Sequence, residues 1–352
     1  MAHGWTGFLY APATTLKRQC GWLITAYGCA APDITIGEFP INRINRRYFL
    51  ASCTAGLAAA SLSAGAAQGS DAEAAKAPPL CVFSKHLQFL NYEKLAVTCR
   101  QLRLDGVDLT VRRGGHVRPE RVAVDLPKAV DALRAEGIAV PMITTDYLSA
   151  KDPYVPEVLA AAQQCGISYC RIGSHRYVQD EAIAEQLRRI TEDIRGLAAV
   201  AEEHEITAGY HNHSGANNFG AHLWDLYRVY EQVDSPYLGS NFDVGHAQVE
   251  NGYGNWEITA RLMAPWVRMM SVKDFYFEDG KPLWCPLGEG MVDVARYLAL
   301  FRTHAGFAGP VSLHFEYKIK GREEMIQEIE KTVNYMRKEI FPKAGYGDSR
   351  VS

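Results

Sequence analysis

The sequence predicts a single (β/α)8 barrel, in which eight parallel strands are each followed by a helix. From residue 80 onward, short apolar runs of strand length alternate about eight times with longer runs of helical periodicity. Repeated strand–helix units are typical of a parallel sheet, and eight such units close into a barrel. Of the 352 residues 47% are hydrophobic, so one full core can be buried.

The elements can be placed from these runs. The expected strands are residues 81–84, 106–109, 140–143, 169–172, 206–210, 238–242, 268–272 and 311–315. Helical spacing of apolar residues, clearest in the last segment, predicts helices over residues 92–102, 126–136, 155–165, 181–204, 222–232 and 323–339. We assign no helix after the sixth and seventh strands.

A leader is expected before the barrel. Arg46 and Arg47 directly precede an alanine-rich run that ends in the small-x-small pattern of residues 64–66. The order Arg-Arg-x-Phe-Leu resembles a bacterial twin-arginine export signal. We therefore predict an upstream extension or wrongly assigned start (1–40), a cleavable signal (41–67), a linker (68–79), the barrel (80–341) and a C-terminal tail (342–352). The expected partner during export is the twin-arginine translocase, and the expected location is periplasmic or secreted, with no stable membrane span after cleavage.

Charge and cysteine content narrow the function classes. A formal net charge of -3 gives no reason to expect nucleic acid as a partner. No two cysteines have the CxxC spacing of a zinc site, so we expect small core residues rather than disulfides at Cys81, Cys99, Cys165, Cys170 and Cys285.

Ionisable side chains follow seven of the eight expected strands. In a (β/α)8 barrel the active site lies at the C-terminal ends of the strands, because the βα loops gather there. The residues at these ends include Lys85, Arg113, His116, His175, His211, His213, Asp243, His246, Lys273, His314 and Glu316. This enrichment predicts an active site, in which we expect Lys85, Arg113, His116, His175 and His246 to bind the substrate.

Spacing suggests roles for the others. His211 and His213 are two residues apart on a strand, so both should enter one pocket. Asp243 could cap a helix, but no helical period follows it directly, so we favour a site carboxylate. Lys273 is a candidate proton shuttle or enediolate stabiliser, or else an ion-pair partner of Asp274 or Glu316. The glycines of residues 288–290 lack phosphate-loop neighbours, and we expect no nucleotide site there.

Five motifs together resemble the xylose-isomerase-like TIM-barrel superfamily, in its sugar phosphate isomerase/epimerase branch. They are Gly-Tyr-His-Asn-His (209–213), Asn-Phe-Asp-Val-Gly-His (241–246), Val-Lys-Asp (272–274), Pro-Leu-Gly-Glu-Gly-Met-Val-Asp (286–293) and Gly-Pro-Val-Ser-Leu-His-Phe-Glu (309–316). The resemblance implies a divalent cation held by Glu, Asp, His and Glu from strands five to eight.

This chain departs from that ligand pattern. His211 replaces the first Glu, Ser271 replaces the His, and only Asp243 matches directly. A rebuilt set of His211, Asp243, His314 and Glu316 is the predicted metal site. Oxygen and imidazole ligands suit Mn2+, Zn2+, Co2+ or Mg2+, and two imidazoles favour the softer Zn2+ or Mn2+.

The resemblance implies a metal-assisted isomerase or epimerase of a sugar or keto-sugar, acting by proton abstraction next to a carbonyl. The predicted catalytic groups are Lys273, His213 and Glu316. A lyase or dehydratase of keto-glycosides or inosose-like polyols begins with the same step, and a non-catalytic sugar-binding barrel is a third alternative. Core packing, which we favour, or a contact in a homo-oligomer is expected for Trp256, Trp266, Tyr276 and Trp284.

Overall fold

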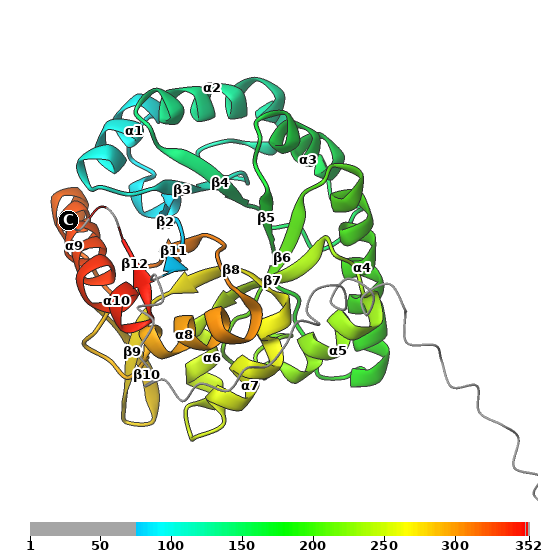
Figure 1. Ribbon diagram of the computed structural model, residues 1–352. Coiled ribbons are helices and arrows are strands. Elements are labelled where there is room, and N and C mark those ends of the chain that lie inside the picture. The colour runs from blue at the N-terminus through cyan, green and yellow to red at the C-terminus, as the bar shows by residue number, and fades with distance from the viewer. Residues whose placement is uncertain (1–74, 349, 351–352) are drawn as a thin grey trace, which may run out of the picture. The chain divides into compact units, whose positions relative to one another are not determined.

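A computed structural model describes residues 75–348 and 350, and these contain a closed barrel of eight parallel strands (Figure 1). Each strand lies within two residues, at either end, of its expected range. In order around the barrel they are β11 (Val311–Leu313), β2 (Leu80–Phe83), β3 (Gly106–Thr110), β4 (Ala139–Thr144), β5 (Tyr169–Ile172), β6 (Thr207–His211), β7 (Leu238–Asp243) and β8 (Val267–Val272). The predicted fold class is confirmed. The predicted export signal lies outside the described residues.

Helices surround the barrel, as Figure 1 shows. Those expected are α1 (Tyr92–Gln101), α2 (Val122–Ala135), α3 (Val155–Gln164), α4 (Ile183–Glu203), α5 (Trp224–Val233) and α9 (Gly321–Tyr335). In α4 the side chains of Ile190, Ile194, Leu197 and Ala201 recur every three or four residues and are buried, as on an amphipathic helix that covers a sheet. None of the described helices is long and apolar enough to cross a membrane.

Three helices and one hairpin lie where no element was assigned, namely α6 (Val244–Asn251), α7 (Trp256–Met263), α8 (Val294–Ala305) and the antiparallel pair β9 (Asp274–Glu278) and β10 (Lys281–Cys285). Residues 244–248 of α6 are all buried, so α6 has no polar face to produce a helical period. Asp279 and Gly280 connect β9 to β10 with positive φ angles of 49° and 72°, the two-residue turn that a right-twisted hairpin favours.

The remaining elements are short. Beside the barrel, β1 (Ala75–Lys76) pairs in parallel with β12 (Tyr346–Gly347). A π-helical turn (Met336–Ile340) continues α9 into α10 (Phe341–Lys343), and 3-10 helices cover Ser84–Leu87, Pro119–Arg121 and Ala264–Trp266. The segment before β11 passes close to β8 at Gly309, where a Cβ atom would lie 1.9 Å from the Arg268 carbonyl oxygen, so no larger residue fits.

The expected core residues are largely found in the core. The five described cysteines are unpaired, and all but Cys165 are buried. Trp256, Trp266 and Trp284 pack against the core, whereas Tyr276 is 42% exposed on β9. A contact between copies of the chain stays a prediction.

Candidate active site

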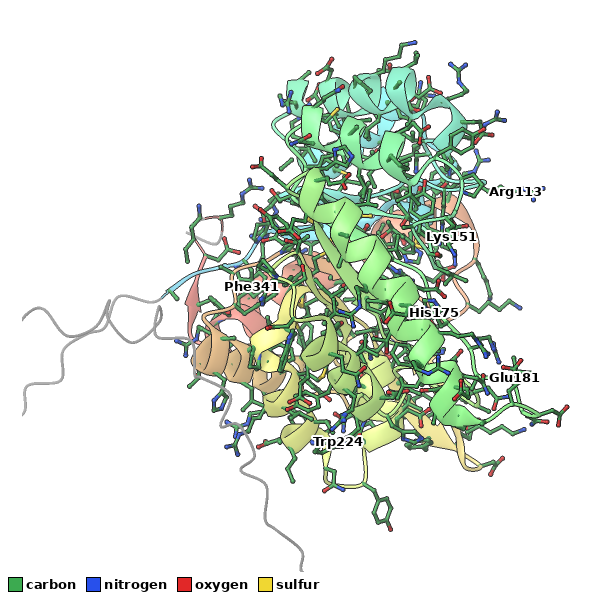
Figure 2. All side chains as sticks on the ribbon, turned by 90° about the vertical axis from the view of Figure 1, so that its right-hand side faces the viewer. Arg113, Lys151, His175, Glu181, Trp224 and Phe341 are labelled. Atoms are coloured by element: carbon green, nitrogen blue, oxygen red, sulfur yellow. The ribbon has the colours of Figure 1, made fainter. Side chains whose placement is uncertain are left out.

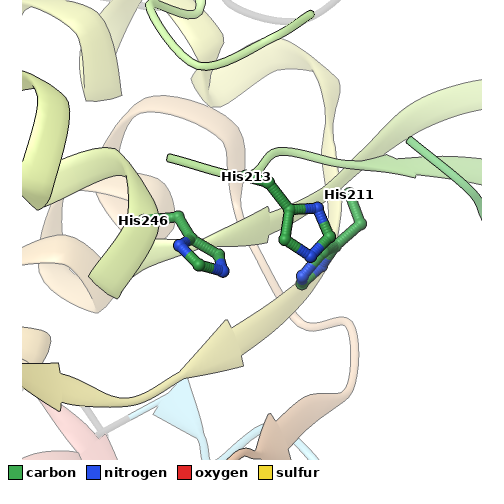
Figure 3. Close-up of side chains that lie close together, drawn as sticks. All are labelled: His211, His213 and His246. Carbon is green, nitrogen blue, oxygen red and sulfur yellow. The ribbon is translucent and has the colours of Figure 1, made fainter. Parts of the chain in front are cut away.

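Three histidines gather at the C-terminal ends of the strands (Figure 3). His211 is the last residue of β6, and its ring centroid lies 4.6 Å from that of His213, so the two rings lie together at the end of the barrel, as their spacing predicts. His246 reaches the same place from α6, with its ring 4.7 Å from that of His213. Local spacing therefore identifies the first two rings, and the fold adds the third.

Serine hydroxyls orient two of these rings. Ser174 Oγ lies 2.7 Å from His213 Nδ1, and Ser214 Oγ lies 2.8 Å from His246 Nδ1. With Nδ1 engaged, the Nε2 atom of His213 is the one left to meet a substrate, a proton or a cation, whereas His246 Nε2 lies 2.6 Å from Lys273 Nζ.

Asp243 serves two purposes at the end of β7. The expectation that it does not cap a helix is wrong, because its Oδ1 accepts a hydrogen bond of 2.8 Å from the His246 backbone N–H at the start of α6. Its other oxygen, Oδ2, lies 3.5 Å from His211 Nε2 and 3.1 Å from Lys273 Nζ. One carboxylate therefore starts the helix that carries His246 and also faces the pocket.

Lys273 follows β8 and is only 3% exposed. Its Nζ lies 2.5 Å from Glu316 Oε1 and 2.6 Å from His246 Nε2. Of the two expected ion-pair partners it therefore meets Glu316. Asp274 instead accepts backbone hydrogen bonds from Phe275, Gly288, Gly290 and Val292.

His314 lies deeper in the barrel. Its ring stacks on Phe83 at 4.7 Å and on His211 at 5.7 Å, and its Nε2 is 3.9 Å from Asp108 Oδ2. Ser271, at the position where the related pattern has a His, donates a hydrogen bond to Asn241 Oδ1.

Within the part of the chain that the structure describes, two groups of residues could hold a metal ion, and each has its ligand atoms within 4.8 Å of one another. One is His211, Asp243 and His314; the other is His211, His213 and His246. Glu316 of the predicted ligand set belongs to neither and pairs with Lys273 instead. In the first group His211 Nδ1 and His314 Nε2 are buried without a hydrogen-bond partner, whereas Asp243 Oδ2 contacts Lys273 Nζ at 3.1 Å. Buried polar atoms normally have partners, so this donor set fits a divalent cation.

Burial keeps the imidazoles of the site neutral. Desolvation lowers the pKa of His211, His246 and His314 well below the usual value, and lowers that of His213 to about 3. The Arg171 guanidinium is the second cause for His211 and His213. Neutral rings can bind a metal or accept a proton. Burial also raises the pKa of the Asp243 carboxyl to about 6, although the Lys273 ammonium opposes this shift.

The residues predicted to bind substrate do not all lie together. His246 joins the cluster, whereas Lys85 is exposed and Arg113 lines a cleft of about 690 Å³ that also contains Tyr147 and Tyr154. Figure 2 shows Arg113, Lys151 and Glu181 at the same edge of the molecule. His116 lines a different hollow, of about 250 Å³.

His175 does not join the cluster either. It stacks on Tyr210 at 5.9 Å and meets the edge of Phe219. Tyr210 precedes His211 on β6 and so points to the opposite face, away from the barrel interior. His175 therefore packs outside the barrel wall, because it is held by a residue of the outward face.

Sequence reasoning missed several residues of the site. The Trp284 indole on β10 lies 4.6 Å from Lys273 Nζ, and its ring meets the edge of the His246 ring at 5.0 Å. Arg171 and Asp108 are buried inside the barrel. Each is a charged residue within a short strand of mostly uncharged residues, and this pattern could have identified it. A charged side chain is rarely buried unless it has a partner.

The fold and the site define a (β/α)8-barrel protein with its ionisable groups at the C-terminal rim. The chain belongs to the xylose isomerase-like TIM barrel family, whose sequence model matches residues 98–339. This confirms the superfamily that the motifs resemble. No curated protein matches the chain in sequence.

Solved structures share this fold at low sequence identity. A xylose isomerase domain protein from Alicyclobacillus acidocaldarius has a TM-score of 0.61 at 15% identity, covering 77% of this chain and 99% of that one. The probable 3-DHS dehydratase AsbF from Bacillus anthracis has a TM-score of 0.59 at 13% identity, covering 74% and 99%. D-psicose 3-epimerase from Clostridium cellulolyticum H10, solved with D-tagatose, has a TM-score of 0.57 at 11% identity, covering 74% and 98%.

Proposed function

We propose that this protein is an isomerase or epimerase of a sugar or keto-sugar that removes a proton next to a carbonyl. The observation that carries the proposal is a cluster at the end of the barrel, in which the neutral His213 ring lies 4.7 Å from the His246 ring and His246 Nε2 lies 2.6 Å from the buried Lys273 Nζ. Proton abstraction needs a base that is unprotonated at neutral pH, and the resulting enediolate needs a nearby positive charge. The family and the fold shared with a D-psicose 3-epimerase support this class of substrate.

A divalent cation is part of the proposal. His211, Asp243 and His314 would hold it, without the Glu316 of the set predicted from the sequence. When bound, the cation would polarise the substrate carbonyl oxygen as a Lewis acid.

Three side chains of the protein carry out the proton transfers. His213, with Nδ1 bonded to Ser174, accepts the proton at Nε2. Lys273 donates hydrogen bonds to the oxygen that becomes negative. Glu316, a carboxylate that is 36% exposed beside Lys273, takes a proton from the ammonium and delivers it from another side, which gives the epimer or isomer. Lys273 regains its proton from solvent.

The alternative is a lyase or dehydratase of keto-glycosides or inosose-like polyols, supported by the fold shared with the probable dehydratase. The first step is the same, but the intermediate then expels a β-oxygen. Export by the predicted leader would favour free sugars or glycosides over phosphorylated ones. A non-catalytic sugar-binding barrel is the third hypothesis.

The test is product analysis in D2O with the Mn2+- or Zn2+-supplemented full chain and a panel of keto-sugars and keto-glycosides. Isomerisation or epimerisation yields a product of unchanged composition that gains solvent deuterium at the carbon next to the carbonyl. Loss of water or an aglycone would instead establish the lyase. If the protein binds a sugar without turnover, and Lys273→Ala leaves this binding unchanged, the protein is a non-catalytic sugar-binding barrel and the proposal is wrong.

A further inference from the structure

The ammonium of Lys273 has surroundings that resemble those of a bound metal ion. Its Nζ has Glu316 Oε1 at 2.5 Å, His246 Nε2 at 2.6 Å and Asp243 Oδ2 at 3.1 Å. Carboxylate oxygens and imidazole nitrogens are also the usual ligands of divalent cations. Two of these partners, Asp243 and Glu316, belong to the ligand set predicted from the sequence.

One oxygen atom faces both the ammonium and the candidate metal site. Asp243 Oδ1 accepts the His246 backbone N–H, so only Oδ2 remains for a cation. Oδ2 lies 3.5 Å from His211 Nε2 on one side and 3.1 Å from Lys273 Nζ on the other. A cation bound at about 2.1 Å from Oδ2 would lie no further than roughly 5 Å from the ammonium, the sum of the two distances. Like charges this close in a buried site repel strongly.

Packing prevents Lys273 from moving aside freely. The Trp284 indole covers the ammonium at 4.6 Å, a contact that favours an organic cation. At Gly245 of α6 a Cβ atom would lie 2.6 Å from Lys273 Cγ and 3.0 Å from Trp284 Cζ3. The glycine therefore allows the helix, the lysine stem and the indole to pack against one another, and hairpin β9–β10 fixes the ammonium in place.

We infer that Lys273 competes with the divalent cation for the carboxylates of the site. Its ammonium takes Glu316 and shares Asp243 Oδ2, so the cation is held by His211, Asp243 and His314 without Glu316. The binding affinity is consequently lower than the same ligands would give beside a neutral residue. This inference rests on the metal-binding part of the proposed function, and it concerns affinity rather than catalysis.

The experiment measures the dissociation constants of Zn2+ and Mn2+ for the full chain by competition with a chromogenic chelator. Lys273→Met keeps much of the stem and removes the charge, and its affinity should rise at least tenfold. The matched control is Lys281→Met, since Lys281 is exposed on hairpin β9–β10, which follows Lys273. This variant should bind the cations as tightly as the wild type does. Equal or weaker binding by a folded Lys273→Met variant, judged by circular dichroism, overturns the inference.

A second pair of variants keeps the test decisive if Lys273→Met does not fold. Asp243→Asn should lose at least a hundredfold in affinity, whereas Glu316→Gln should lose clearly less, because Glu316 is not a ligand and acts only by offsetting the charge of Lys273. Equal losses in both variants overturn the inference.

The experiment also distinguishes a failure of this inference from a failure of the proposed function. If the wild type binds no cation but Lys273→Met does, the inference holds and metal assistance fails. If neither the wild type nor Lys273→Met binds a cation, the inference is overturned. The deuterium-incorporation experiment then still decides whether the proposed reaction occurs.

Discussion

Asn212 and Asp243 exchange two hydrogen bonds across the ends of β6 and β7. The backbone N–H of Asp243 donates to Asn212 Oδ1 at 2.8 Å, and Asn212 Nδ2 donates to the Asp243 carbonyl oxygen at 3.1 Å. Strand alternation sends Asn212 to the face opposite His211 and His213. The asparagine therefore ties the chain segment of these two histidines to the start of the helix that carries His246.

Replacing this asparagine should weaken the protein. Asn212→Ala leaves the buried Asp243 N–H without a partner and removes one of the hydrogen bonds to the Asp243 carbonyl oxygen, so we expect the free energy of unfolding to fall by about 1–3 kcal/mol. Urea denaturation measures the change. The control is Asn255→Ala, because Asn255 is exposed and its side chain makes no capping hydrogen bond to α7; it should stay within about 0.5 kcal/mol of the wild type. Equal effects would show that the exchange is energetically unimportant.

Asp274 should organise the loop between β10 and α8. Its carboxylate accepts backbone N–H groups from Phe275, Gly288, Gly290 and Val292 at 2.8–3.0 Å. Asp274→Ala removes all four acceptor contacts, so we expect a loss of roughly 3 kcal/mol or more and faster proteolysis within residues 286–292. Limited proteolysis followed by mass spectrometry locates the cleavage. Glu278→Ala, an exposed change on the same hairpin, should be cut as slowly as the wild type, and a similarly slow Asp274→Ala would contradict the prediction.

Features of the structure that depend on residues close together in the chain could be predicted from the sequence. The strands follow from apolar runs, and the proximity of the His211 and His213 rings follows from their two-residue spacing. The same alternation shows that Tyr210 faces outward, so the outer position of His175 was partly accessible as well. The Asp279-Gly280 pair is also typical of a two-residue hairpin turn.

The features that could not be predicted depend on an element that is buried or on contacts between residues far apart in the chain. Helix α6 is buried along its first half and lacks an amphipathic pattern, so the capping role of Asp243 stayed hidden. The partners Lys273 and Glu316 are 43 residues apart, and the choice between Glu316 and Asp274 required the loop that binds Asp274. The contact of Trp284 with Lys273 likewise depends on how hairpin β9–β10 folds back over the barrel end.

The pH dependence of stability should reflect His86. Its Nε2 accepts the backbone N–H of Phe315, and burial, reinforced by Lys85, lowers its pKa from 6.5 to about 3. A base with a lowered folded-state pKa contributes stability above pH 6.5, and this contribution is lost as the pH falls towards 3. Between pH 7 and 4 the wild type should lose about 3 kcal/mol more than His86→Gln, which can still accept the hydrogen bond. Urea denaturation at both pH values measures this.

The control for His86 is His304→Gln, since His304 is exposed on α8. It should follow the wild-type pH dependence. Parallel pH curves for the wild type and His86→Gln would show that this ring does not resist protonation in the folded protein.

The last prediction separates two roles for His213, which lies in the pocket as a neutral ring and also belongs to the second group able to hold a metal. If His213 is the base, His213→Gln should lower solvent-deuterium incorporation by about 10²–10⁴-fold, the usual contribution of a positioned proton-transfer group. Its affinity for Zn2+ or Mn2+ should stay close to that of the wild type. His222→Gln, an exposed change in the loop before α5, should alter neither quantity. Loss of metal together with activity would assign the ring to the metal instead, and unchanged incorporation would remove it from the reaction.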